Sequence, residues 1–175
     1  MQRSRRLADP RSWGRRGLLA ALLLAAGGCG FTPPYGEGTD AVEMAGRVDV
    51  APMTGAAGFD MRERLVQRLG PATAPTHRLE VELALRQVGV ALTQESVTTR
   101  FEVIGVADYR LIPLAGGPPA EAGTLRSVTG YSAPASSTGS AFAIRAAEQD
   151  ANRRLAVDLA DAIVQRLALS AGEWM

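Results

Sequence analysis

The sequence predicts an α+β fold in which two helices pack on one face of a four-stranded, mostly antiparallel sheet. Long segments in the middle of the chain alternate apolar and polar residues, as half-buried strands do. One segment before these strands and one after them repeat apolar residues at helical spacing. The resulting order is β-α-β-β-β-α, and packing both helices on one face leaves the other face of the sheet partly free.

The first 28 residues have the composition of a secretory signal. The first sixteen carry six arginines and one acid, Asp9, and an apolar run from Gly17 to Gly28 follows. This run is shorter than the roughly 20 apolar residues that span a membrane, and it ends in small residues, as a cleavable signal does. We expect residues 1–28 to be removed, while "GRRGLL" leaves the export route open.

Cys29 is the only cysteine of the chain and directly follows Ala26, Gly27 and Gly28. This pattern matches the bacterial lipobox, in which the cysteine becomes the acylated first residue of the mature protein. Because two acyl chains already hold a protein stably on a membrane, we predict lipidation at Cys29. Residues 29–45, rich in glycine, proline and acids, are the expected tether. The alternative is an unmodified cysteine, buried or near the cleavage site.

The mature chain is acidic. Removing the signal takes six of the 19 basic and one of the 18 acidic side chains, leaving 13 and 17 and a formal net charge of −4. A net negative domain has no electrostatic reason to bind nucleic acid, which requires neutralised phosphates. Residues 46–175 have the length of one domain.

The first two elements of this domain are a short strand and a helix. Residues 47–53, "RVDVAPM", alternate as a strand does. A helix is expected in "GFDMRERLVQRLGP", with Asp60 and Glu63 as a capping box and Gly70 at its end. Its expected buried stripe is Phe59, Leu65, Val66 and Leu69.

Three strands are expected next. In residues 77–92 the apolar positions change phase after Arg86 and Gln87, which suggests a β-bulge. Residues 100–114 alternate with Arg100, Glu102, Asp108 and Arg110 on the polar face. Leu125 to Tyr131 is the fourth strand. The apolar face of the third strand is expected to hold Phe101, Val103, Ala107, Tyr109 and Leu111.

A helix of about 30 residues completes the domain, because the last segment is rich in alanine and has no internal breaker. Arg145 is expected in its first turn, where a cation opposes the helix dipole. Together with the preceding "SSTGS", this arginine suggests a phosphate site, and the alternative is an exposed arginine without a ligand. The expected buried stripe is Ile144, Ala147, Ala151, Leu155, Leu159, Ile163 and Leu167.

No catalytic set, metal site or cofactor site is expected. His77 is the only histidine, so neither a Ser/His/Asp set nor a metal cluster is apparent, and we expect it to be a surface residue. The carboxylate pairs Glu80/Glu82 and Asp158/Asp161 are interpreted as solvated faces. The chain is therefore not expected to be an enzyme.

Several segments resemble the LPS-assembly lipoprotein family (LptE, also called RlpB). They are "CGFTPPYG" after the lipobox, "RLVQRLG", "YRLIPLAG", "GYSA" and "AEQDANRRLAVDLADAIVQRL", which occur in the family's order across the mature chain. The resemblance implies an outer-membrane lipoprotein on the periplasmic side. It also implies that the protein plugs the LptD β-barrel, aids its assembly and binds lipopolysaccharide.

The resemblance further implies a role for two arginines. Arg145 occupies the position of a basic lipopolysaccharide contact ahead of the acidic "EQD" of the last helix. A second contact of the family lies before the third strand, where Arg100 is the nearest candidate. The alternative function is a periplasm-facing auxiliary lipoprotein of a lipid-transporting ABC system, and it would copurify with an inner-membrane transporter.

Overall fold

A computed structural model describes residues 44–92, 98–132 and 140–175. Cys29, the signal of residues 1–28 and most of the tether lie outside these residues, and so does most of "SSTGS". The described part belongs to one compact unit, Glu37–Met175.

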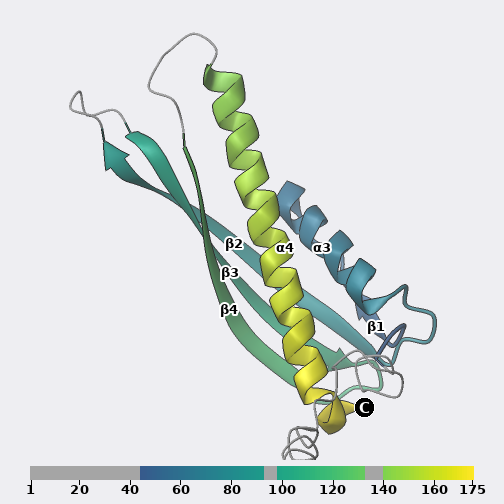
Figure 1. Ribbon diagram of the computed structural model, residues 1–175. Helices are drawn as coiled ribbons and strands as arrows, with labels where there is room; N and C mark the ends of the chain where they lie inside the picture. Colours follow the sequence, from purple (N-terminus) through teal and green to yellow (C-terminus); the bar gives the residue numbers. More distant parts are fainter. Residues whose placement is uncertain (1–43, 93–97, 133–139) are drawn as a thin grey trace, which may run out of the picture. The chain divides into compact units, whose positions relative to one another are not determined.

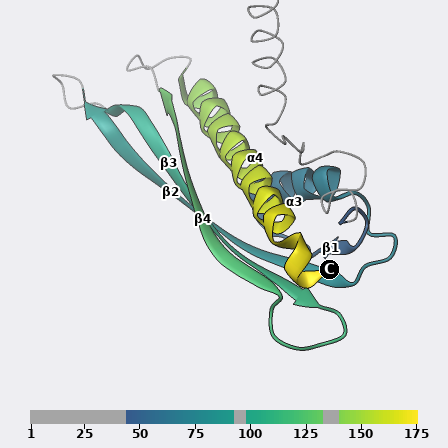
Figure 2. The same ribbon diagram turned by 60° about the horizontal axis from the view of Figure 1, so that its bottom comes forward.

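The predicted fold class and element order are confirmed (Figures 1 and 2). Helices α3 and α4 lie on one face of the sheet, and α4 runs along much of its length. The elements are β1 (Val48–Val50), α3 (Gly55–Leu69), β2 (His77–Leu92), β3 (Thr98–Pro113), β4 (Glu121–Ser132) and α4 (Ser140–Trp174).

The sheet has the strand order β1-β2-β3-β4. β1 pairs with β2 in parallel, whereas β2 with β3 and β3 with β4 are antiparallel. Parallel neighbours need a crossover of a dozen or more residues, which α3 and its flanking loops supply. The strand predicted at residues 47–53 is shorter than expected, and the fourth strand is longer than Leu125–Tyr131.

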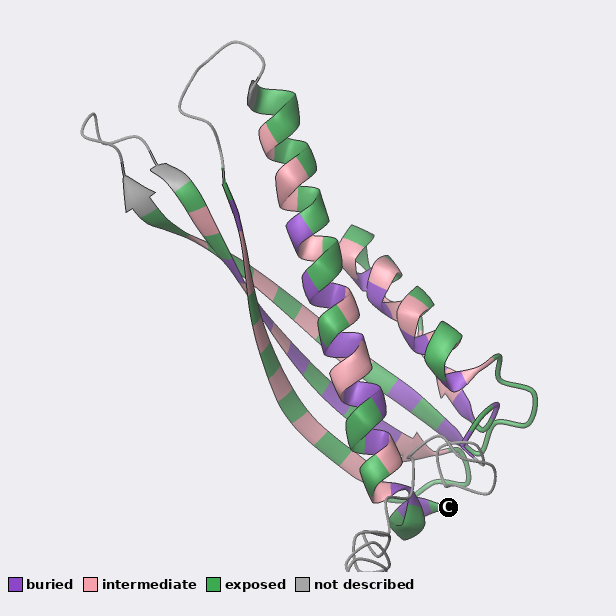
Figure 3. Cartoon of the chain, in the orientation of Figure 1, coloured by how far each residue is buried: buried purple, intermediate pink, exposed green. Residues whose placement is uncertain are grey.

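The core lies between the helices and the sheet, where the buried positions gather (Figure 3). The apolar stripe predicted for α4 is confirmed from Ala151 to Leu167, with Leu155, Leu159 and Ile163 at most 1% exposed, whereas Ile144 and Ala147 are only partly buried. It packs on the predicted apolar face of β3, where Gly105 lets the helix approach closely. We call the other side of the sheet the open face, because both helices lie on the opposite side. It carries the even-numbered residues of the three long strands from Arg78 to Val88, from Arg100 to Ile112 and from Ala122 to Ser132.

The start of α3 differs from the prediction. The alanine-containing segment before Phe59 is helical, so the helix begins at Gly55, and its N-cap Thr54 makes no side-chain capping bond. Asp60 is therefore one turn inside the helix and forms no capping box. Phe59 is 63% exposed because the buried face runs through Gly58, Met61, Leu65 and Leu69. Gly70 ends the helix with φ of 77°, as predicted.

The bulge predicted at Arg86 and Gln87 is misplaced. β2 and β3 stay in regular register as far as Gly89, and the register shifts fall between Gly89 and Leu92. Gln87 keeps its place on the helix side of the sheet because its amide donates a hydrogen bond to Tyr131 Oη at 2.7 Å. Val88 lies on the open face in regular register. The apolar positions of β2 therefore switch from odd to even residue numbers because the open face is more apolar near Val88, and not because of a bulge.

His77 is not the expected surface residue. Its side chain is only 9% exposed, its ring packs edge-on against Trp174 with centroids 5.0 Å apart, and Nδ1 lies 3.0 Å from Thr76 Oγ1. The imidazole thus joins the start of β2 to the end of α4. Burial lowers the pKa of His77 below its ordinary value of 6.5.

This burial predicts a pH-dependent stability. Above pH 6.5 the imidazole is neutral in both states, and its contribution is fully present. As the pH falls below 6.5, the unfolded chain takes up the proton first, so the free energy of unfolding decreases until the pH passes the lower pKa of the folded state. Denaturant unfolding at about pH 7.5 and about pH 5.5 measures the loss. In His77→Gln the decrease in unfolding free energy between the two pH values should be smaller, because the part due to His77 is absent. An equal decrease in both proteins would contradict the role given to His77.

Candidate functional site

Arg145 lies in α4, but not in its first turn. The helix begins at Ser140, so Arg145 is its sixth residue and belongs to the second turn. The helix dipole acts mainly within the first turn, so it does not oppose the charge of Arg145 as expected, and the phosphate site stays a prediction. Its side chain is exposed and makes no hydrogen bond or ion pair with a described residue.

Arg100 lies near the start of β3, directly opposite Ser132 at the end of β4. Its side chain is exposed and belongs to the open face, because its neighbour Phe101 faces the helices. It too has no hydrogen-bond or ion-pair partner among the described residues.

The two predicted contact residues lie at the same end of the domain but in different layers. The beginning of β3 and the beginning of α4 are both at this end (Figure 1). Arg145 belongs to the helix layer, whereas Arg100 points away from it. At this end the structure therefore offers two separate guanidinium groups that no described residue engages, and not one converged pair.

A polar and aromatic cluster lies on the helix side of the sheet, close to Arg100. Tyr131 stacks on Phe101 with ring centroids 5.2 Å apart and accepts the hydrogen bond from Gln87. Burial raises the pKa of Tyr131, the nearby charge of Glu148 on α4 raises it further, and the hydrogen bond from Gln87 lowers it. The phenol is thus neutral at physiological pH, and the cluster ties β2, β3 and β4 together at this end of the sheet.

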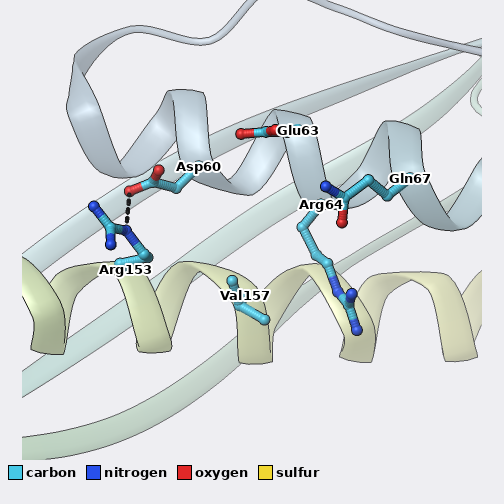
Figure 4. Close-up of a pocket in the computed structure, with 6 residues that line it drawn as sticks. All are labelled: Asp60, Glu63, Arg64, Gln67, Arg153 and Val157. Atoms are coloured by element: carbon cyan, nitrogen blue, oxygen red, sulfur yellow. Dashed lines mark ion pairs between the residues drawn. The ribbon is translucent and has the colours of Figure 1, made fainter.

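A groove of about 400 Å³ lies between α3 and α4 (Figure 4). Its polar side chains serve largely to join the helices. Arg64 donates two hydrogen bonds to Asp161, each 2.9 Å long, and Arg153 Nε lies 3.6 Å from Asp60 Oδ2. The sequence analysis interpreted Asp161 as part of a solvated face, but its carboxylate is paired with Arg64. We interpret the groove as structural.

The open face is the side of the sheet that neither α3 nor α4 covers (Figure 1). Among the described residues it holds partly exposed apolar side chains, including Val128 at 50% exposure, together with charged ones. The sequence contained a signal for it, namely the change of apolar phase in β2, which we interpreted as a bulge. Only the register across three strands shows which of these side chains are neighbours.

Neither a metal cluster nor a membrane-spanning helix is found in the described ranges. No group of three or more His, Cys, Asp or Glu residues there is placed to hold an ion. None of the helices described has the length and apolar character to cross a bilayer.

These features define a small two-layer α+β domain whose free surfaces are suited to binding. The family model for LptE, described as lipopolysaccharide-assembly, matches residues 45–167. The chain therefore belongs to the LptE lipopolysaccharide-assembly family, a non-enzymatic lipoprotein family. This confirms the resemblance found in the sequence. No curated protein matches the chain.

Solved structures share the fold. A lipoprotein from Caulobacter crescentus CB15 superposes with a TM-score of 0.59 at 22% identity, covering 74% of this chain and 94% of the other. Rare lipoprotein B from Shewanella oneidensis gives 0.53 at 16% identity, covering 70% and 92%. At these identities the likeness shows a common fold.

Proposed function

We propose that this protein is an outer-membrane lipoprotein that plugs the LptD β-barrel, aids its assembly and binds lipopolysaccharide. Membership of the LptE family is the observation that carries this proposal. The domain of residues 46–175 acts on the periplasmic side of the membrane, held by the acyl chains on Cys29 through the tether of residues 29–45. The signal of residues 1–28 is removed.

The charged surface and the buried core of the domain support the plug role. The lumen of an outer-membrane barrel is polar, and the ends and outer surfaces of the domain carry many exposed charged side chains. Its core is complete without a partner, with Leu65, Leu79, Leu111 and Leu159 almost fully buried. A domain that folds around its own core can enter a barrel as a preformed unit.

Arg145 and Arg100 are the proposed lipopolysaccharide contacts. Guanidinium groups bind phosphates through paired hydrogen bonds, and neither arginine is engaged by a described residue. Because they lie in different layers at one end, they contact different parts of the lipid, and each contributes separately.

An affinity purification of the lipidated, detergent-extracted protein tests the proposal. We expect a large outer-membrane β-barrel to copurify in stoichiometric amount, as identified by mass spectrometry. Recovery of inner-membrane ABC transporter subunits would instead support the auxiliary-lipoprotein function, and recovery of neither would refute the plug role. Arg100→Gln with Arg145→Gln should retain the barrel and weaken lipopolysaccharide binding.

A further inference from the structure

A hollow in the middle of the open face carries two further arginines. Its volume is about 360 Å³, and its lining includes Ala84, Ile104 and Val106, with Arg86 and Arg126 at its two sides. None of these five residues was singled out as a site by the sequence.

The strand register fixes how the two arginines lie. Arg86 on β2 is level with Ile104 and Val128, and Arg126 on β4 is level with Val106. They are two strands apart and offset by two residues, which separates their Cα atoms by about 12 Å at the usual strand spacing and rise. Ile104 and Val106, on the strand between them, line the hollow.

Neither guanidinium group has a partner in the part of the chain that the structure describes. Arg86 and Arg126 are exposed and make no hydrogen bond or ion pair with a described residue. Glu102 and Asp108 stand on the diagonals of Arg86 and Arg126, but neither forms an ion pair with its arginine. Thr124 donates a hydrogen bond to Asp108. Glu102 and Asp108 flank the hollow along β3, one on each side, and their negative charges repel an anion. An anionic group therefore fits beside the arginines but not farther along the strand.

The apolar residues around the hollow extend it into a band. Val88 and Val128 lie on the same face beside Ile104, and Val128 is half exposed. Two free cations beside exposed apolar surface complement an amphiphile, which offers anionic groups and hydrocarbon together. A free phosphate ion would use only the arginines.

We infer that this hollow is a second binding site for a phosphorylated glycolipid. Arg86 and Arg126 each bind one anionic group, and the band formed by Ala84, Ile104, Val106 and Val128 contacts apolar parts of the lipid. The inference rests on the proposed function and extends it, because the site lies apart from Arg145 and involves residues that the family resemblance did not indicate.

Binding of purified lipopolysaccharide to the full lipidated chain in detergent tests this inference. The double variant Arg86→Gln, Arg126→Gln should bind about tenfold more weakly, since an exposed charge pair contributes up to a factor of about five. The matched control is Arg78→Gln, Arg110→Gln, which removes the same charge from the other end of the open face and should leave the affinity unchanged.

Two altered ligands identify the chemistry. For dephosphorylated lipopolysaccharide, the wild type and the Arg86/Arg126 variant should have the same affinity, because the groups that the arginines bind are missing. With the deacylated, phosphorylated backbone, affinity should fall because the apolar contacts are lost. Equal affinity for the intact and deacylated ligands would overturn the amphiphile site in favour of a phosphate site.

The outcomes separate this inference from the proposed function. If Arg100→Gln with Arg145→Gln weakens binding but the Arg86/Arg126 variant binds like wild type, the second site is refuted and the proposed contacts stand. If the Arg86/Arg126 variant loses only the copurifying barrel, the hollow is a protein contact and the inference is again wrong. If the wild type binds no lipopolysaccharide, both assignments fail, and the barrel purification decides the plug role independently.

Discussion

Replacing Gly105 by alanine should destabilise the domain by about 1–3 kcal/mol, the usual cost of overfilling a packed core. Gly105 lies on the helix side of β3, where an added Cβ would overlap Leu155 Cδ2 and lie 3.1 Å from Leu159 Cδ1. Both leucines are at most 1% exposed, so they have little room to move. Strand propensity alone predicts the opposite sign, because glycine weakens a strand interior. Denaturant unfolding gives the free energy directly.

Two further variants test the cause of this loss. Ala122→Val adds methyl groups on the open face of β4, where they meet solvent, and should change stability by less than about 0.5 kcal/mol. Leu155→Ala by itself should cost about 2–5 kcal/mol, but combining it with Gly105→Ala should cost less than the sum because the clash is relieved. Additive losses would show that Leu155 is not what the new methyl group meets.

Replacing Cys29 by serine should release the protein from the membrane. The thioether that carries two acyl chains cannot form on a serine, and in cells depleted of the barrel the domain has no other proposed attachment. Since each buried CH₂ contributes about 0.8 kcal/mol, losing the chains removes nearly all of the membrane affinity. Fractionation of cells depleted of the barrel should find the variant outside the membrane fraction, and intact-mass spectrometry should show no acyl chains.

Thr32→Ala is the matched control for this variant. It changes a hydroxyl three residues along the same tether and should leave both acylation and fractionation unchanged. A Cys29→Ser protein that remains in the membrane fraction would show that a segment other than the lipidated cysteine holds it there.

The sequence predicted the order of elements because both periods of apolar residues were clear. The apolar residues of α4 from Ala151 to Leu167 share one face only in a helix. Those of β3 share one face only in a strand. The start of α3 was missed because Thr54, a residue of a common capping type, precedes a segment with two glycines, and Asp60 with Glu63 imitates a capping box one turn too late.

The candidate site was less predictable for a physical reason. Whether Arg86 and Arg126 share a surface depends on the pairing of three strands, and single-strand alternation does not determine that register. The same holds for His77, whose burial depends on Trp174 at the far end of the chain. Arg145 was placed too early in the helix because several residues of "SSTGS" are common at helix starts, and the pattern does not determine which of them begins α4.

Site-specific photo-crosslinking in cells tests the plug role most directly. We would place the crosslinker at Ala122 on the open face, at Phe59 on α3 and at Leu169 on α4, which are exposed positions in both layers. A plug is surrounded by its barrel, so all three positions should crosslink to the same outer-membrane β-barrel protein. Crosslinks to the barrel from one layer only, or to an inner-membrane transporter, would contradict the account.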